Sequence, residues 1–300
     1  MPRFPRSMLA AMVSPQGSAE RTDFELLDAG DGRRLERFGA RVVDRPAPTA
    51  TEPRRTPGAW WSPELRYAGN AWFGSEVALQ PWRVSLGGVD LELRPTASGG
   101  LGVYPEHLAN LDWLASRVAE RAGRGGAGRA PTLLNLFAHT GLLTLAAARA
   151  GAAVTHVDGS RSAVAWARHN AELSGLADRP VRWIVDDALG FAEREGRRER
   201  RYDGIVLDPP SFGHANRRRW RLAETLPDLL WACRQVAAKE AFVLLTAHTT
   251  GLDGAALEAA LRVAFPRAGR RVEQQPLELE ATSGARLPLG WAVRLGGSEG

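Results

Sequence analysis

The fold of this chain is decided by the stretch Asn135-Leu136-Phe137-Ala138-His139-Thr140-Gly141. It completes an apolar run that begins at Thr132, and an Ala- and Leu-rich segment follows it as far as about Ala150. The run is short enough for a buried strand, and the segment after the turn predicts a helix. In a doubly wound sheet, ligands bind beyond the carboxyl ends of the strands, where a glycine allows close approach of the backbone. The turn is therefore a candidate cofactor site.

Three later apolar runs also end at acidic residues. They are residues 153–157 before Asp158, residues 181–185 before Asp186 and Asp187, and residues 202–207 before Asp208. Because parallel strands bring their carboxyl ends to one edge of a sheet, these acids should lie near the turn. We therefore predict the α/β fold class, with a Rossmann-like sheet that has helices on both faces.

The turn lacks the glycines of the dinucleotide fingerprint G-x-G-x-x-G, because only Gly141 is present. S-adenosylmethionine has no pyrophosphate and carries a sulfonium cation, so it needs neither that glycine cluster nor a basic residue at the helix start. This difference favours S-adenosylmethionine over a nicotinamide dinucleotide. The Asp158 carboxylate could accept hydrogen bonds from both ribose hydroxyls. Asp187 could accept one from the adenine amino group, although Asp186 and Asp187 could instead cap the next helix.

The segment Asp208-Pro209-Pro210-Ser211-Phe212 has a chemistry of its own. The lone pair of a nucleobase amine is delocalised into the ring, so the nitrogen becomes nucleophilic only when acceptors hold its N–H groups. The Asp208 carboxylate and the Pro209 carbonyl could be these acceptors. Pro209 and Pro210 fix the loop, and Phe212 offers a face on which a planar base can stack. The alternative is an ordinary Pro-Pro loop with a core phenylalanine.

From about Asp23 onward, the chain resembles the class I S-adenosylmethionine-dependent methyltransferases related to the bacterial large-subunit ribosomal RNA methyltransferases of the RlmI and RlmK type. The matching stretches are residues 25–39, 102–106, 135–141, 154–158 and 207–213. The resemblance implies a methyltransferase sheet preceded by a small β-rich substrate-binding part. It implies cofactor contacts at Phe137, Ala138, His139, Thr140, Gly141, Asp158 and Asp187. Residues 208–212 would face the acceptor.

One departure concerns the cysteine nucleophile of family members that methylate carbon 5 of cytosine. That cysteine follows the fifth strand, and here the corresponding run, residues 241–246, is followed by Ala247-His248-Thr249-Thr250. Cys233 is the only cysteine, and its neighbours predict a buried, inert position in an amphipathic helix. We therefore expect direct in-line methyl transfer, without a covalent intermediate and without a metal.

Basic residues give a second indication of the partner. The formal net charge is +5, but Lys239 is the only lysine, and a bias to arginine does not by itself create a binding face. Arg217, Arg218 and Arg219 follow the Asp-Pro-Pro segment and could bind RNA phosphates beside the acceptor. A solvated loop is the alternative for these three arginines, and it is the favoured interpretation for the arginines of residues 197–201.

The sequence patterns divide the chain into three parts. Residues 1–21 predict a mobile leader, residues 22–100 a small β-rich substrate-binding domain, and residues 101–300 the methyltransferase domain. In the small domain, residues 82–86 and 89–93 flank Gly87-Gly88 and predict a hairpin. The aromatic residues expected to fill its core, with base stacking as the alternative, are Trp60, Trp61, Trp72 and Phe73.

The sequence as a whole predicts a cytoplasmic S-adenosylmethionine-dependent N-methyltransferase acting on RNA, specifically a guanine of large-subunit ribosomal RNA. No apolar run approaches the roughly 18 residues of a membrane span, and a single cysteine cannot form a disulfide framework. A small-molecule or protein methyltransferase is the alternative enzyme, since no PUA-type RNA-binding module is recognisable. A methyltransferase-like RNA-binding or assembly protein with little activity is the alternative from another class.

Overall fold

The computed structural model describes residues 23–124, 129–215, 218–266 and 270–298. Its centre is a seven-stranded sheet with the order β10-β9-β8-β11-β14-β16-β15. Five strands are parallel, and β16 and β15 add an antiparallel pair at one edge. The strands are β8 (Thr132–Leu136), β9 (Ala153–Asp158), β10 (Val181–Val185), β11 (Tyr202–Leu207), β14 (Ala237–Ala247), β15 (Arg270–Glu280) and β16 (Arg286–Ser298). The predicted α/β fold is confirmed.

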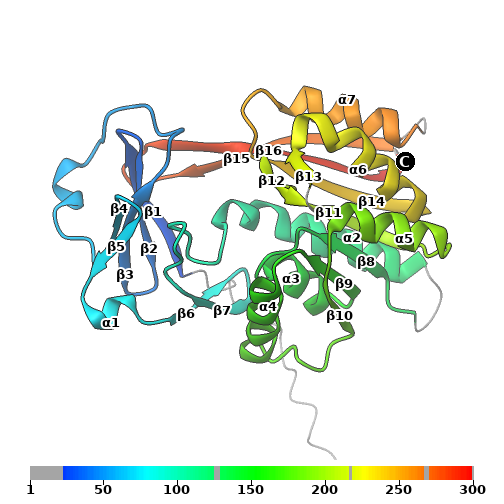
Figure 1. Cartoon of the computed structure of the whole chain (residues 1–300), viewed down its shortest axis with the longest axis horizontal. Coiled ribbons are helices and arrows are strands. Elements are labelled where there is room, and N and C mark those ends of the chain that lie inside the picture. Colours follow the sequence, from blue (N-terminus) through cyan, green and yellow to red (C-terminus); the bar gives the residue numbers. More distant parts are fainter. Residues whose placement is uncertain (1–22, 125–128, 216–217, 267–269, 299–300) are drawn as a thin grey trace, which may run out of the picture.

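Helices cover both faces of this sheet, and Figure 1 shows α6 and α7 on one side and α3 and α4 on the other. Alternation along the strands explains the two layers, since Leu133 belongs to the hydrophobic cluster of one face and Leu134 to that of the other. Neighbouring strands repeat the pattern, with Val206 on the first face and Ile205 on the second. The helices are α2 (Leu111–Arg124), α3 (Leu142–Arg149), α4 (Arg161–Leu173), α5 (Ala188–Arg197), α6 (Leu222–Val236) and α7 (Gly254–Ala264).

The N-terminal part forms a five-stranded sheet and a separate hairpin. Tight turns shape both, because φ is positive at Asp31 and Gly32 and again at Gly87 and Gly88, as two-residue hairpin turns require. The sheet contains β1 (Phe24–Gly30), β2 (Arg33–Phe38), β3 (Arg41–Pro46), β4 (Leu65–Ala68) and β5 (Ala71–Gly74), with η1 (Pro57–Trp60) and α1 (Glu76–Leu79) beside it. The hairpin is β6 (Trp82–Leu86) with β7 (Val89–Leu93), as predicted.

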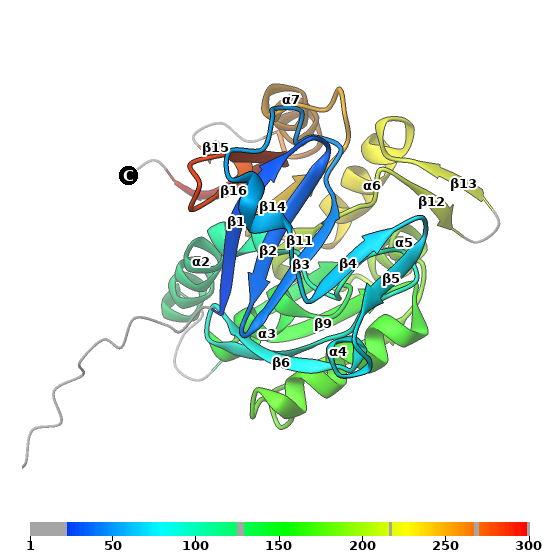
Figure 2. The same cartoon turned by 90° about the vertical axis from the view of Figure 1, so that its left-hand side faces the viewer.

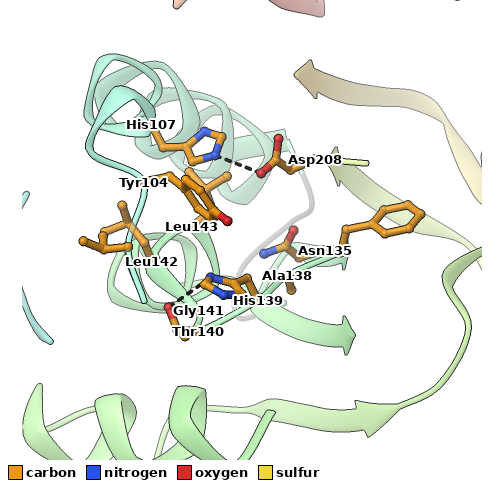
Figure 3. A pocket seen from close by; sticks show the side chains of 12 residues that line it. Tyr104, His107, Asn135, Ala138, His139, Thr140, Gly141, Leu142, Leu143 and Asp208 are labelled. Atoms are coloured by element: carbon orange, nitrogen blue, oxygen red, sulfur yellow. Dashed lines mark hydrogen bonds and ion pairs between the residues drawn. The ribbon is translucent and has the colours of Figure 1, made fainter. Parts of the chain in front are cut away.

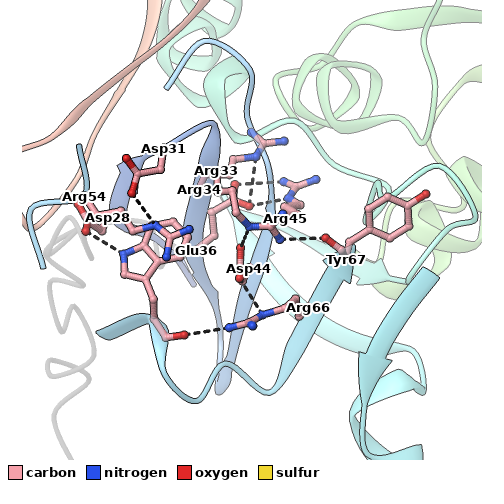
Figure 4. A network of polar contacts seen from close by, with 11 residues as sticks. Asp28, Asp31, Arg33, Arg34, Glu36, Asp44, Arg45, Arg54, Arg66 and Tyr67 are labelled. Atoms are coloured by element: carbon pink, nitrogen blue, oxygen red, sulfur yellow. Dashed lines mark hydrogen bonds and ion pairs between the residues drawn. The ribbon is translucent and has the colours of Figure 1, made fainter. Parts of the chain in front are cut away.

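The N-terminal sheet is joined to the central sheet by packing and by hydrogen bonds. Figure 2 shows it in front of the central sheet, and Figure 1 shows β15 and β16 extending toward it. Asp28 of β1 accepts hydrogen bonds from the Trp60 indole (2.9 Å) and from the hydroxyl of Ser283 (2.7 Å), which lies in the β15–β16 turn. Figure 4 shows the polar network around Asp28, in which the buried Arg45 Nε also donates to Glu36 at 2.6 Å. The two parts predicted on either side of residue 100 therefore pack against each other.

The expectation for the aromatic residues of the N-terminal part needs correction. Trp60 is buried as expected, but 84% of Trp61 and 58% of Phe73 are exposed, so the expectation of a core role is wrong for these two residues. Trp61 follows η1 on the outside of the sheet, and Phe73 lies on the short edge strand β5. The helical segment that follows the N-terminal part begins as the 3₁₀ helix η2 (Pro105–Asn110) and becomes α2 at Leu111.

Within the described ranges, no helix is both long and apolar enough to cross a membrane. The predicted leader, residues 1–21, lies outside the described residues.

Candidate active site

The turn after β8 is tightly folded around left-handed residues. The φ angle is +57° at Phe137, +48° at His139 and +95° at Gly141. A positive φ is costly for residues with a Cβ atom, and such strain gathers at functional sites. The His139 N–H donates to Oδ2 of Asp158 at 2.8 Å, and the Ser160 N–H donates to Oδ1 at 2.8 Å. Asp158 thereby fixes the turn to the start of α4.

A cavity of about 420 Å³ lies at the sheet edge where the strand order reverses between β8 and β11. Cavities of this size hold small ligands and cofactors. The predicted residues that line it are Phe137, His139, Asp158, Asp187, Asp208, Pro209 and Pro210. The predicted Ala138, Thr140 and Gly141 line a narrower space beside it, which Figure 3 shows together with Tyr104, His107 and Asp208.

The two acids after β10 already have local partners. Asp187 is the N-cap of α5, and its Oδ1 accepts a hydrogen bond from the Gly190 N–H at 2.8 Å. Asp186 forms an ion pair with Arg194. The alternative of helix capping is thus correct for Asp187. Its carboxylate also lines the 420 Å³ cavity, so capping and a cofactor contact are compatible.

Asp208 is held by two histidines that the sequence analysis did not assign. Its Oδ2 lies 3.0 Å from Nε2 of His107, which belongs to η2, and its Oδ1 lies 3.2 Å from Nε2 of His248, which follows β14. The hydroxyl of Thr246, on β14, also contacts Oδ1. Three chain segments that are far apart in sequence therefore meet at one carboxylate.

These contacts decide the ionisation of the cluster. Burial alone would raise the pKa of Asp208, but the neighbouring His107 and His248 outweigh it and hold that pKa well below its ordinary value. Burial tends to lower the histidine pKa values, yet the attraction of Asp208 raises the pKa of His107 above its ordinary value and that of His248 to about 9. These shifts favour the ionised form of Asp208 and the protonated form of both histidines, and His248 is an imidazolium at neutral pH.

Aromatic rings gather beside this cluster. The Tyr104 ring centroid lies 5.3 Å from that of His139 and 6.4 Å from that of His248. Burial lowers the pKa of His139 despite the attraction of Asp158 and Asp208. His139 is thus the neutral imidazole of the site, between the cofactor turn and the Asp208 cluster.

The Asp-Pro-Pro segment continues into a hairpin of β12 (Phe212–Ala215) and β13 (Arg218–Arg221), which the sequence analysis did not expect. The buried Trp220 indole donates to the Pro210 carbonyl at 2.7 Å and so holds the loop. Phe212 is 74% exposed, which contradicts the core alternative for this residue. Arg217 lies outside the described residues, and Arg218 and Arg219 are described only as backbone of β13.

Cys233 is buried in α6, as predicted, and burial raises the pKa of its thiol. It lies in the hydrophobic cluster that packs between α6 and the sheet and lines neither space around Asp208. The residues that sequence reasoning missed are Tyr104, His107, Trp220, Thr246 and His248. His107 directly follows residues 102–106, and His248 comes two positions after Thr246. Nothing in a single sequence pairs these histidines with Asp208, which is 101 and 40 positions away from them.

Three comparisons place this geometry among known proteins. A solved S-adenosylmethionine-dependent methyltransferase from Agrobacterium tumefaciens is 34% identical, with a TM-score of 0.84 over 93% of this chain and 92% of that one. A methyltransferase structure from Streptococcus mutans, at 16% identity and a TM-score of 0.72 over 93% of this chain and 76% of that one, shares the fold. Residues 109–242 match the family described as Conserved hypothetical protein 95.

Curated relatives match over a shorter stretch. The large-subunit ribosomal RNA methyltransferase K/L of Methylococcus capsulatus is 45% identical over 85 residues, which are 28% of this chain and 12% of that protein. The corresponding enzyme of Syntrophotalea carbinolica is 44% identical over 82 residues, which are 27% of this chain and 11% of that protein. The match therefore spans only a small part of these relatives.

Proposed function

The chain belongs to the S-adenosylmethionine-dependent methyltransferases, and from this premise we propose that it methylates a nitrogen of an RNA base, specifically a guanine of large-subunit ribosomal RNA. The observation that carries the proposal is the Asp208-Pro209-Pro210 segment, which lies at the cofactor cavity beside an exposed Phe212. The 45% identity to a ribosomal RNA methyltransferase over 85 residues supports the choice of acceptor.

The cofactor cavity fits S-adenosylmethionine by its donor and acceptor groups. When bound, this cofactor supplies a methyl group on a sulfonium cation. Asp158 would accept hydrogen bonds from the ribose, because each of its oxygens uses one lone pair for a backbone N–H and has a second available. Asp187 would receive the adenine amino group at the oxygen that does not cap α5. Among the described residues that line the 420 Å³ cavity, none is a lysine or an arginine, which suits a cationic ligand.

The acceptor would lie on the Asp208 side of the cavity. Asp208 and the Pro209 carbonyl would hold the N–H groups of the base, while Pro209 and Pro210 keep the loop rigid. The exposed ring of Phe212 would stack on a base. Because this arrangement involves no thiol, the transfer would proceed without a covalent intermediate, and its rate would come mainly from positioning.

We assign RNA binding to two other regions. Residues 22–100 would act as a substrate-binding domain, and its exposed Trp61 and Phe73 could stack on bases. Arg217, Arg218 and Arg219 would contact phosphates near the acceptor. An acceptor in ribosomal RNA implies that the protein works in the cytoplasm.

The proposal is tested by mass spectrometry of nucleosides from large-subunit ribosomal RNA of cells with and without the gene. One methylated guanine should be missing without the gene. Purified protein with labelled S-adenosylmethionine should restore it on that RNA. If a protein or a small molecule is labelled and RNA is not, the acceptor is that molecule and the proposal of an RNA acceptor is wrong.

A further inference from the structure

We propose that His107 and His248 form a cationic clamp on Asp208, and that the clamped carboxylate selects an acceptor that donates an N–H group. The inference deepens the proposed function and rests on it for the transfer of a methyl group beside Asp208. It assigns positioning roles to two histidines and does not depend on the acceptor being RNA.

The geometry of the clamp is the first argument. His107 and His248 approach from different elements and take different oxygens of the same carboxylate, with Nε2 to oxygen distances of 3.0 and 3.2 Å. Asp208 follows β11 at the sheet edge, where its side chain is 17% exposed. A carboxylate held at both oxygens cannot rotate away from the cavity that it lines.

The hydrogen bonds of His248 indicate that its ring is positively charged. Its Nδ1 lies 2.7 Å from the carbonyl oxygen of Leu289, and its Nε2 faces Asp208. A carbonyl oxygen and a carboxylate oxygen can only accept hydrogen bonds, so both ring nitrogens of His248 must carry hydrogen. An imidazole with two N–H groups is an imidazolium cation. The backbone thus holds His248 in its charged form opposite Asp208.

Several polar and titratable groups face Asp208 or its two histidines. They are Tyr104, Glu106 and His107 from the segment that enters α2, His139 from the turn after β8, and Thr246 and His248 from β14 and its end. Glu106 is buried, and its Oε1 lies 3.9 Å from Nδ1 of His248. Glu106 therefore places a second buried acidic side chain near His248. Without the histidines, burial would favour the protonated, neutral form of Asp208.

The clamp has a consequence for the acceptor. A carboxylate offers about four acceptor positions. His248 and Thr246 contact Oδ1, and His107 contacts Oδ2, which leaves one position on Oδ2 beside the cavity. A fixed anion with one free acceptor position attracts an N–H group. An ionised carboxylate or phosphate oxygen has no hydrogen to donate to this position, so the clamp disfavours O-methylation of an acid.

The first experiment needs no acceptor. The imidazole nitrogens of the full chain are followed by NMR between pH 6 and 9, with Asp208→Asn and His169→Gln for comparison. His169 is half-buried beside Glu92, outside the Asp208 cluster. His248 should show two protonated nitrogens at neutral pH in the wild type and in His169→Gln. In Asp208→Asn its titration should move down by at least about one pH unit. A neutral His248 in the wild type would overturn the proposal.

Turnover provides the second readout. The kcat–pH profiles of His107→Gln, His248→Gln and the double variant are compared with that of wild type and His169→Gln. Glutamine retains a hydrogen bond but not the charge, so the double variant should lose activity at neutral pH and regain it as the pH rises. The midpoint should lie at least about one pH unit above that of the wild type. A profile equal to that of the wild type would refute the clamp.

Metal analysis of the purified protein tests an alternative explanation of the cluster. The side-chain nitrogen and oxygen atoms of His107, Asp208 and His248 all lie within 4.8 Å of one another, which is close enough to hold a metal ion. If the wild type binds one equivalent of a divalent metal and His107→Gln does not, the cluster is a metal site and not a protonated clamp. If NMR shows the clamp but no RNA base is methylated, the proposed acceptor fails and the clamp stands.

Discussion

The backbone N–H of His139 donates a hydrogen bond to Oδ2 of Asp158 at 2.8 Å. This bond joins the strained turn after β8 to the end of the neighbouring strand β9. Asp158 therefore serves the fold of the turn and, on our proposal, the ribose of the cofactor. The two roles are compatible, because the backbone contacts use only one lone pair on each oxygen.

We predict that Asp158→Ala weakens S-adenosylhomocysteine binding by about 2–4 kcal/mol, the value of a pair of charge-assisted hydrogen bonds. Asp158→Asn should lose less, because its amide oxygen can still accept one hydrogen bond. Calorimetry measures both affinities, and the exposed Asp178→Ala serves as the control that should bind normally. An unchanged affinity in Asp158→Ala would remove Asp158 from the cofactor site.

Cys233→Ala should retain methyl transfer. The thiol is buried in α6 and burial raises its pKa, so it offers no thiolate at neutral pH. The substitution creates only a small cavity, so the melting temperature should fall slightly. A folded variant that binds cofactor normally but has lost turnover would reinstate a covalent mechanism.

The sequence predicted the fold well because its signals are local. The turn at Gly141 and the acid at Asp158 each directly follow an apolar run, so the strands and the sheet edge that they share could be inferred together. The Asp208 clamp could not be inferred in this way, because His107 and His248 are distant in the chain and each resembles an ordinary loop histidine. The β12–β13 hairpin was missed for a related reason, since residues 212–221 lack the alternating apolar pattern of a strand.

The network around Asp28 predicts a pH-dependent stability. Burial alone would raise the Asp28 pKa, but hydrogen bonds from Trp60, Thr56 and Ser283 lower it to about 2. A depressed folded-state pKa stabilises the protein above the ordinary carboxyl value, and this contribution is lost as the pH falls from about 4 toward 2. Asp28→Asn should therefore reduce the free energy of unfolding by about 1–2 kcal/mol at pH 7, and by less at pH 3.

Urea unfolding at the two pH values measures the effect of Asp28→Asn. Asp31→Asn is the matched control, because Asp31 lies in the next turn with its side chain 59% exposed and should contribute little at either pH. A cost for Asp28→Asn that does not change between pH 7 and pH 3 would show that its ionisation is not linked to folding.

Asp208 and Phe212 should affect different steps. Asp208→Ala removes the group that would hold the acceptor N–H, so turnover should collapse while RNA affinity changes little. Phe212→Ala should weaken RNA binding by about 1–3 kcal/mol, the value of one stacked base, while cofactor affinity stays unchanged. Single-turnover kinetics and filter binding on the same RNA separate the two effects. Equal loss of RNA affinity in both variants would contradict this division.

The arginines after the Asp-Pro-Pro segment give a test of the RNA acceptor itself. Replacing Arg217, Arg218 and Arg219 together by alanine should weaken RNA binding and flatten its salt dependence, because fewer counterions are released from the phosphates. Cofactor affinity should not change. The matched control removes three exposed arginines at the end of α5 and in the loop after it, Arg197, Arg200 and Arg201, and should leave the salt slope unaltered.

Binding titrations at several salt concentrations measure both triple variants. If the first variant keeps the salt slope of the wild type, these arginines form a solvated loop, and residues 22–100 must supply the RNA contacts. If it instead methylates a protein or small molecule as well as the wild type does, while no RNA is modified, the acceptor is not RNA. Charge on the hairpin of β12 and β13 would then have no part in substrate selection, and the acceptor would have to be recognised within the cavity beside Asp208.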